Sequence, residues 1–396
     1  MTFAEALADL NEWYFFREFV YSKNTFRPSP QIEVELADNV LWLGELLLVF
    51  QLKEREAALE TTEAAERKWF EKKILEHATR QIRDTLRYLD ENNSIALQNH
   101  RGHSRNLEIG NIRQIHKLVV YLPNKLLLKD CLKVKYRVSK TVGVIPIIPA
   151  HDYLGIVQTL LTPVEVADYL DFREQLIEIW SEQVKDIPEP ALVGQFLYAD
   201  SSTPPSLSFL DHLKTHDQHA DEWDMSGIIS QFHDRVTTEK IPTDYYAIIT
   251  ELASLKRNEL REFKVRFQLS IDKSRTDVMT QPYRIAVPRI DCGFVFIPLT
   301  KAMLRHSRTA VSNMTLAHKY DQRLTKCIGV AIGNHEQGWF NAEWCYVTSY
   351  GHRTTTWISY LRITIRSAQS RLLSYHSTNT KMPEEKANTK LAHYNN

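Results

Sequence analysis

Asp38, Gln51 and Lys53 flank a short segment whose pattern indicates two strands joined by a turn at Gly44-Glu45. If those two residues form the turn, residues that face one another across the strands have numbers that sum to 89, so Asp38 lies opposite Gln51. Directly opposed residues share one face of a sheet with Cβ atoms roughly 4.5–5.5 Å apart, and Lys53, two residues further on, lies on that face too. The sequence therefore predicts that a carboxylate, an amide oxygen and an ammonium group meet on one patch.

This combination of groups suits the hydrolysis of phosphodiester bonds. Mg²⁺ or Mn²⁺ prefers oxygen ligands and binds proteins through one or two carboxylates, with water and substrate phosphate completing its shell. Asp38 would be the main anionic ligand, and Gln51 could add a neutral amide oxygen. Lys53 could orient the attacking water or neutralise the charge that develops on the phosphate. Glu18, at the end of the first predicted helix, is a candidate second ligand, directly or through water.

The alternative is that Asp38 and Lys53 form an incidental pair at the end of a strand. The run from Leu46 to Phe50 is entirely apolar, which is typical of a buried central strand. Polar groups at the end of such a strand would cost several kcal/mol to bury unless they serve one another or a ligand. This cost favours a functional site.

The surrounding elements predict an α/β fold with a mixed sheet in residues 1–150. A helix is expected over Ala4–Phe19, and a long helix from Thr61 or Thr62 to about Asn92, with apolar residues along one stripe. The expected strands are Gln31–Leu43, Leu46–Lys53, Ile95–Asn99, Gln114–Leu122 and Val142–Pro149.

The remainder of the chain divides into three further regions. Residues 151–264 are expected to be mostly helical, with a loop over Asp211–Asp224. Residues 265–376 are expected to form an α+β region, and the polar tail 377–396 is expected to be disordered. The strands expected in the third region are Val265–Ile271, Gly293–Pro298, Lys326–Ile332 and Trp339–Val347.

Composition excludes several classes of protein. The four cysteines lie far apart, with no CxxC pair, so neither a disulfide framework nor a zinc site is expected. The first ten residues carry acids where a signal peptide needs bases, and no apolar run approaches the ~20 residues of a membrane span. We therefore expect a cytoplasmic protein with no membrane partner.

Charge is unevenly distributed along a chain whose net charge is zero. Residues 67–140 carry 17 Lys/Arg against 7 Asp/Glu, and residues 150–230 carry 3 against 15. The basic segment could follow a phosphate backbone, or the two segments could simply be unequal solvated faces. Within the basic segment, Arg101 and His103 could contact nucleic acid or could belong to an ordinary polar loop.

Ala37-Asp38, followed by an apolar strand that ends Phe50-Gln51-Leu52-Lys53, resembles the PD-(D/E)xK superfamily of restriction-endonuclease-like nucleases. The resemblance covers roughly residues 4–149. It implies a core made of a helix with an acid (Glu18 here), a strand pair with Asp and Glu/Gln-x-Lys, and a helix packed on the sheet. It also implies Mg²⁺-dependent DNA cleavage, with Gln81 and Tyr88 similar to supporting residues of some members.

One residue departs from the usual pattern of this superfamily. Gln51 stands where Glu is usual, which removes a charge from the metal site and could weaken or abolish activity. The expected function is a metal-dependent DNA endonuclease in bacterial restriction or antiphage defence. The alternative is a non-catalytic module of nuclease fold that binds nucleic acid or a partner protein of a defence complex. For the endonuclease, the regions beyond residue 150 would supply target sensing or contacts for a homo-oligomer.

Overall fold

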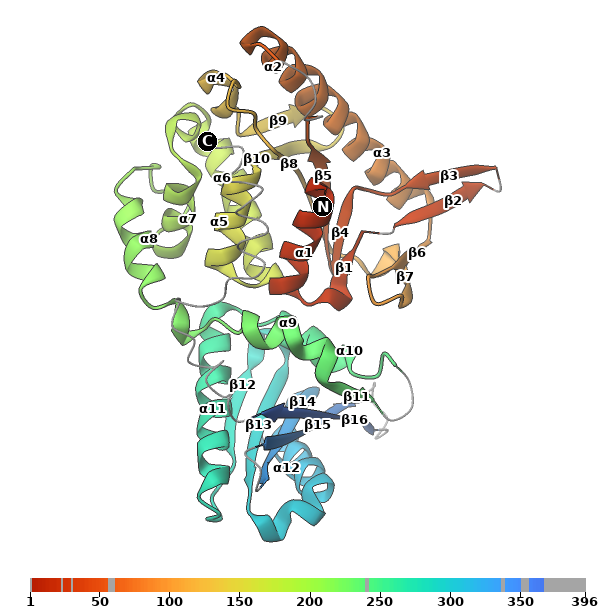
Figure 1. Cartoon of the computed structure of the whole chain (residues 1–396), viewed down its shortest axis with the longest axis vertical. Coiled ribbons are helices and arrows are strands. Elements are labelled where there is room, and N and C mark those ends of the chain that lie inside the picture. The colour runs from red at the N-terminus through yellow and green to blue at the C-terminus, as the bar shows by residue number, and fades with distance from the viewer. Residues whose placement is uncertain are drawn as a thin grey trace. The chain divides into compact units, whose positions relative to one another are not determined.

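The computed structural model describes residues 2–22, 24–29, 31–55, 61–238, 242–335, 339–349 and 356–366 (Figure 1). Contacts within the chain divide it into two units, one that extends to His219 and one that begins at Ala220. In the colours of Figure 1, the first unit runs from red to light green and the second from green to blue. No helix in the described ranges has both the length and the apolar character needed to cross a membrane.

The first unit contains a six-stranded mixed sheet with the strand order β1-β4-β5-β8-β10-β9. The three strands β5, β8 and β10 are parallel neighbours, whereas the pairs β1–β4, β4–β5 and β10–β9 are antiparallel. The expected α/β class with a mixed sheet is therefore confirmed. The strands are β1 (Val20–Tyr21), β4 (Asn39–Leu43), β5 (Leu46–Lys53), β8 (Gln114–Tyr121), β9 (Tyr136–Ser139) and β10 (Gly143–Pro149).

The hairpin β4–β5 has the register that the sequence predicts. Asn39 pairs with Phe50 and Leu43 with Leu46, so every pair sums to 89. Gly44 in the turn has φ 58°, a left-handed conformation that glycine adopts without the penalty of a Cβ atom. The expected strand over Gln31–Leu43 is divided, however: β3 (Ile32–Glu35) ends before β4 begins, and β3 pairs with β2 (Thr25–Ser29) in a separate ribbon.

Helices cover both faces of the first sheet. On one face, a continuous helix comprises α2 (Glu63–Trp69), a π-helical stretch (Phe70–His77) and α3 (Ala78–Glu91), close to the predicted bounds. Its buried side chains Phe70, Ile74, Ala78 and Ile82 pack on Val119 and Tyr121 of β8 and on Ile145 and Ile147 of β10. On the other face, Tyr153 of α5 (Ala150–Leu160) packs edge-to-face on Phe50, and its hydroxyl donates to Asn11 of α1 (Phe3–Phe15).

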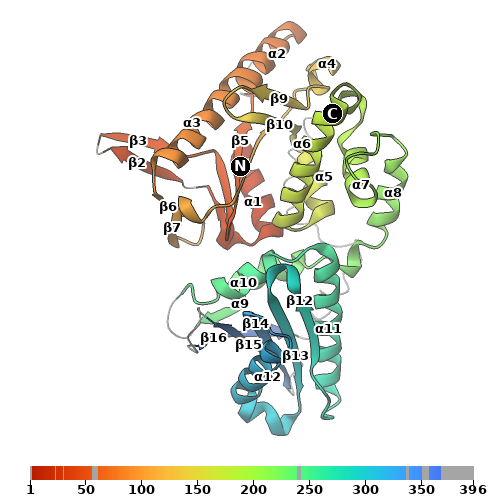
Figure 2. The ribbon, with the colours of Figure 1, turned by 180° about the vertical axis from the view of Figure 1, so that it is seen from behind.

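The helices between residue 150 and His219 belong to the first unit (Figures 1 and 2). Glu189 accepts hydrogen bonds from Arg173 (Nε–Oε1 2.6 Å), Tyr169 (2.7 Å) and Lys135 (Nζ–Oε2 3.1 Å), and all four side chains are buried. Because Lys135 precedes β9 of the sheet, this network joins sheet and helices. The helices are α6 (Pro163–Asp186), α7 (Glu189–Tyr198) and α8 (Phe209–Asp217), with a short α4 (Lys129–Leu132) before β9.

The second unit has its own six-stranded mixed sheet, ordered β11-β16-β15-β14-β13-β12. The strands are β11 (Val236–Thr238), β12 (Tyr283–Val287), β13 (Cys292–Leu299), β14 (Lys326–His335), β15 (Trp339–Ser349) and β16 (Thr356–Arg366). The helices are α9 (Ser226–Arg235), α10 (Tyr246–Ala253), α11 (Arg257–Arg275) and α12 (Ser307–Asp321). Short helical turns in the two units span Arg17–Phe19, Ile109–Asn111, Ala220–Glu222, Pro288–Ile290 and Lys301–His306.

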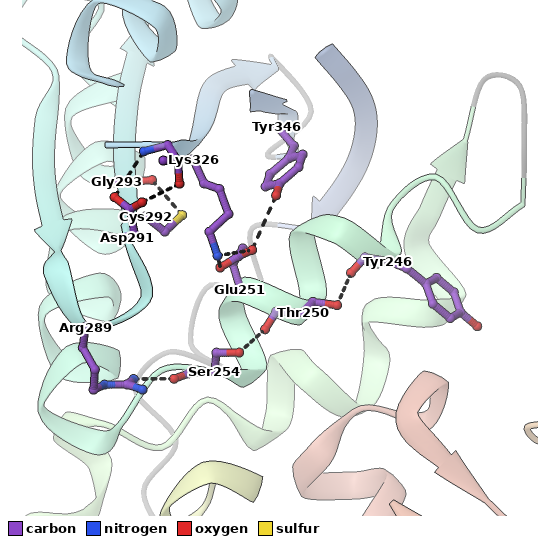
Figure 3. A network of polar contacts seen from close by, with 11 residues as sticks. Tyr246, Thr250, Glu251, Ser254, Arg289, Asp291, Cys292, Gly293, Lys326 and Tyr346 are labelled. Atoms are coloured by element: carbon purple, nitrogen blue, oxygen red, sulfur yellow. Dashed lines mark hydrogen bonds and ion pairs between the residues drawn. The ribbon is translucent and has the colours of Figure 1, made fainter. Parts of the chain in front are cut away.

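A polar network in the second unit joins α10 to the sheet (Figure 3). Glu251 accepts two hydrogen bonds from Lys326 Nζ, at 2.8 and 2.9 Å, and one from the Tyr346 hydroxyl at 3.5 Å. Beside it, Asp291 accepts hydrogen bonds from the backbone NH and hydroxyl of Thr325 at the start of β14. These groups satisfy one another, so we interpret the network as structural.

Two expectations for the later part of the chain are wrong. Val265–Ile271 is not a strand but part of α11. The buried stripe of this helix, which comprises Leu260, Phe263, Phe267 and Ile271, is recognisable only in a stretch of sequence longer than these seven residues. Asp211–Asp224 is not a continuous loop, because α8 extends through it to Asp217. The tail 377–396 lies outside the described residues.

Candidate active site

Asp38 and Lys53 contact one another at the open end of the β4–β5 hairpin. Asp38 Oδ2 accepts hydrogen bonds from the Leu52 backbone NH at 2.5 Å and from Lys53 Nζ at 3.1 Å. Lys53 Nζ also donates to the Leu52 carbonyl at 2.8 Å. The side chains of Lys53 and Asp38 remain 13% and 23% exposed, so a ligand can reach both.

Gln51 brings a buried amide to the same place. It lies two residues before Lys53 on β5, and its neighbour Phe50 pairs with Asn39, the residue that follows Asp38. Its side chain is 2% exposed, and its Oε1 has no hydrogen-bond partner among the described residues. An unsatisfied buried acceptor costs about 1–3 kcal/mol, and a ligand that binds the oxygen would remove this cost.

The α3 face of the sheet carries this cluster. Leu47 and Val49 of β5 pack on Leu89 of α3, and strand alternation places Gln51 and Lys53 on the same side. The register with β8 puts Gln51 beside Val119 and Lys53 beside Tyr121, two residues that α2 and α3 cover. The π-helical stretch therefore runs along the side of the cluster.

The helix residue His77 interacts electrostatically with Lys53 of the cluster. Burial lowers the pKa of the His77 imidazole, and the positive charge of Lys53 lowers it further. Gln81, one helical turn further on, interacts with His77 through its side chain. His77 was not anticipated from the sequence; the signal available was its place one turn before Gln81. It ends a π-helical stretch, a conformation often found at functional sites.

Glu18 does not join this cluster. The first helix ends at Phe15, and Phe16 has φ 66°, so Glu18 falls in the short turn that follows. Since Val20 pairs with Leu41 and Tyr21 with Val40, Glu18 lies toward the Leu43 end of β4, whereas Asp38 precedes the opposite end. A five-residue strand spans roughly 16 Å, too far for both carboxylates to hold one ion.

Glu18 instead holds the turn between β6 (Ser94–Gln98) and β7 (Ser104–Glu108). Its Oε1 pairs with Arg101 Nη1 at 3.0 Å, and its carbonyl accepts a hydrogen bond from Asn99 Nδ2 at 3.1 Å. Asn99 Oδ1 accepts the backbone NH groups of Arg101 and His103, both at 3.1 Å. Burial and then Arg101 lower the pKa of His103. Arg101 and His103 therefore lie with Glu18, away from Asp38.

Tyr88 also lies outside the cluster. Its ring packs edge-to-face on Phe26 with centroids 5.5 Å apart, and the guanidinium of Arg87 lies 5.2 Å from its centroid. It is nearly two helical turns beyond Gln81, over the β2–β3 ribbon. Its contacts are those of a packing residue.

Glu35 is the acidic residue that sequence reasoning passed over. Burial raises the pKa of its carboxyl, the negative charge of Asp38 raises it further, and Lys53 acts to lower it. Its position three residues before Asp38 was the available signal.

The donor set suits a hard cation with few protein ligands. Among the described residues, no group of three or more His, Cys, Asp or Glu side chains is placed to hold a metal ion. A carboxylate oxygen of Asp38 and the unpartnered Oε1 of Gln51 are nevertheless oxygen donors of the kind that Mg²⁺ and Mn²⁺ accept, with water and phosphate filling the remaining positions. The residues present therefore fit such an ion.

Comparisons of the chain with models of protein families, with curated proteins and with solved structures find no match.

Proposed function

We propose that the first unit is a metal-dependent DNA endonuclease of the PD-(D/E)xK type. The observation that carries this proposal is the convergence of Asp38, Gln51 and Lys53 at one end of the β4–β5 hairpin. The element order also supports it, because α1, the antiparallel pair β4–β5, the helix packed on the sheet and the parallel strand β8 occur in that order, with β1 to β3 and the β6–β7 pair inserted between them. The restriction-endonuclease-like core that the resemblance implies has this order.

Each residue of the cluster has a separate task in the proposed reaction. Asp38 and Gln51 would hold Mg²⁺ or Mn²⁺, which polarises the phosphate and acidifies a bound water. Both hydrogen bonds to Asp38 use Oδ2, so Oδ1 is the oxygen available to the ion. Lys53 forms an ion pair with Asp38, and its ammonium group can orient the attacking water and offset the charge that develops on the phosphate.

The cellular setting follows from the proposed activity. A bacterial nuclease of this type would act on DNA in the cytoplasm, in restriction or antiphage defence. Other proteins of the defence system, or a second copy of this chain, would be its partners through the second unit.

A plasmid-cleavage assay tests the proposal. Full-length protein is incubated with supercoiled plasmid and Mg²⁺ or Mn²⁺, beside Asp38→Asn and a control variant, Glu45→Gln, in the exposed hairpin turn. We expect nicking by the wild type and the control, and none by Asp38→Asn. Nicking that persists unchanged in Asp38→Asn would remove the proposed site.

A second candidate function is a non-catalytic module that binds nucleic acid. Gln51 favours this second function, because a neutral amide stands where a carboxylate would add negative charge. The charges of Asp38 and Lys53 cancel, so the three groups together are neutral. Metal-independent binding of DNA without cleavage by the wild type would support this reading.

A further inference from the structure

A serine, a histidine and a carboxylate meet at the β1 edge of the first sheet. Ser22 directly follows β1, His100 lies in the turn between β6 and β7, and Glu12 lies on α1. The Ser22 hydroxyl contacts Nε2 of His100, and the other ring nitrogen, Nδ1, contacts Oε1 of Glu12. We call these three residues, which come from three separate elements, the Ser22–His100–Glu12 triad.

The triad extends from a buried carboxylate to the surface. The Glu12 side chain is 4% exposed, and its Oε2 pairs with Arg17 Nε at 2.6 Å, which leaves Oε1 for His100. The His100 side chain is 32% exposed and Ser22 is half-buried. A small molecule can therefore reach the hydroxyl and the imidazole, whereas the carboxylate is held inside.

The triad and the Asp38 cluster lie on opposite faces of the sheet. Tyr21 of β1 belongs to the same buried cluster as Val40 and as Leu89 of α3, so its side chain is on the α3 side. Strand alternation turns the next residue, Ser22, toward the α1 side, where Glu12 lies. A function of the triad is thus separate from the proposed nuclease site.

The contacts have the connectivity that nucleophilic catalysis by serine requires. A serine hydroxyl becomes a nucleophile when a histidine accepts its proton, and a carboxylate on the opposite ring nitrogen orients the imidazole and stabilises the imidazolium. Nε2 of His100 faces the hydroxyl and Nδ1 faces the carboxylate, as this chemistry needs. We propose that the Ser22–His100–Glu12 triad is a second catalytic site, which hydrolyses carboxylic esters.

The reaction needs water as its only co-reactant. Ser22 Oγ attacks the ester carbonyl carbon while its proton passes to His100 Nε2, and the imidazolium then protonates the alcohol as the ester C–O bond breaks. A water molecule next gives a proton to Nε2 and attacks the acyl carbon. The bond from this carbon to Oγ breaks, Oγ takes the proton back from Nε2, and a carboxylic acid leaves.

Labelling of the full-length protein with a fluorophosphonate tests the proposal, because this reagent forms an Oγ–P bond with activated serines and loses fluoride. Mass spectrometry should find the label on Ser22. We expect Ser22→Ala to abolish labelling and His100→Gln to slow it about a hundredfold or more, since a general base contributes about 10²–10⁴ in rate. Ser94→Ala is the matched control, because the exposed Ser94 hydroxyl donates to a carboxylate, that of Glu108, at 2.9 Å. Hydrolysis of p-nitrophenyl acetate should follow the same order.

Glu12 is a positioning residue, and its contribution should be seen in the pH profile. The hydrogen bond to Glu12 and the charges of Glu12 and Asp9 raise the pKa of His100, while burial and Arg17 lower it. Because the neutral imidazole is the base, labelling should become faster as pH rises through this pKa. Glu12→Gln should move the midpoint to lower pH, and an unchanged midpoint would show that Glu12 does not act through His100.

The remaining outcomes also decide between the readings. An equal labelling rate in His100→Gln and the wild type, or no label on wild-type Ser22, would overturn the triad. An unchanged melting temperature of each variant shows that lost labelling is not caused by unfolding. Labelling should continue in EDTA, which removes divalent ions and should stop DNA cleavage, so that failure of the triad and failure of the proposed nuclease are distinguishable.

Discussion

The network around Glu189 allows a stability prediction that can be worked out from the structure. Arg173 is fully buried and Lys135 nearly so, and both depend on Glu189 for their counter-charge. Burial alone would raise the pKa of Glu189, but Arg173 and Lys135 outweigh it and lower that pKa from its ordinary 4.5 to about 2. The ionised carboxylate is therefore strongly favoured in the folded state.

Glu189→Gln removes the carboxylate that forms ion pairs with both buried cations. Removing one member of a buried ion pair costs about 3–5 kcal/mol. The lowered pKa gives a similar figure, since a pKa difference of this size corresponds to about 3 kcal/mol between the two protonation states. For a unit of roughly 200 residues, each kcal/mol changes the melting temperature by about 2–4 °C, so the figure of about 3 kcal/mol predicts a decrease of about 6–12 °C.

Chemical denaturation at several pH values provides the assay, with Glu182→Gln as the control. Glu182 is exposed and pairs with Lys185 within α6, so its loss should change the free energy of unfolding by less than about 0.5 kcal/mol. Because the folded pKa of Glu189 is depressed, its contribution is present above pH 4.5 and is lost as pH falls toward 2. The difference between wild type and Glu189→Gln should therefore shrink on acidification. Equal stability of the two proteins at pH 7 would refute the role given to this network.

Three further predictions concern the first unit. The side-chain hydrogen bond to Glu12 raises the pKa of His100. The stabilisation from this pair is therefore complete below pH 6.5 and is lost as pH rises through the raised pKa. NMR titration should show the raised pKa of His100, and a measured pKa at or below 6.5 would contradict the prediction. Gln51→Glu should tighten Mn²⁺ binding about tenfold or more by adding a charge to the site, and weaker binding in calorimetry would argue against Gln51 as a ligand. Thr85→Val should lower the free energy of unfolding in denaturant by about 1 kcal/mol, because it removes the hydrogen bond to the Leu36 carbonyl. An unchanged free energy of unfolding would mean that this hydrogen bond does not stabilise the residues between β3 and β4.

The site could be predicted where a local rule determined it. The turn at Gly44-Glu45 sets the register of β4 and β5, and strand alternation places Gln51 and Lys53 on one face of β5, with Asp38 directly before the first residue of β4. These relations need only a two-residue turn and a period of two. The long helix after residue 62 was predicted for a similar reason, because its apolar stripe repeats over several turns.

The sequence could not reveal relations that depend on tertiary structure. Glu18 follows a helical pattern, but which end of the sheet it reaches depends on the pairing of β1 with β4. Glu35 looks like an ordinary strand residue, because its electrostatic interaction with Asp38 and Lys53 exists only in the folded chain. Helices α6 and α7 are joined to the first sheet by the hydrogen bonds of Glu189, whose partners lie 16 or more residues away in the chain.

The convergence of Asp38, Gln51 and Lys53 into one metal-assisted site is tested most directly by single-turnover cleavage. A labelled DNA duplex is mixed with excess protein at saturating Mn²⁺, and the rate for Lys53→Ala is compared with that of the wild type. Because Lys53 acts on the charge that develops during the reaction, we expect a rate lower by about 10²–10³-fold with Mn²⁺ binding retained. Equal rates for the two proteins would contradict the central claim.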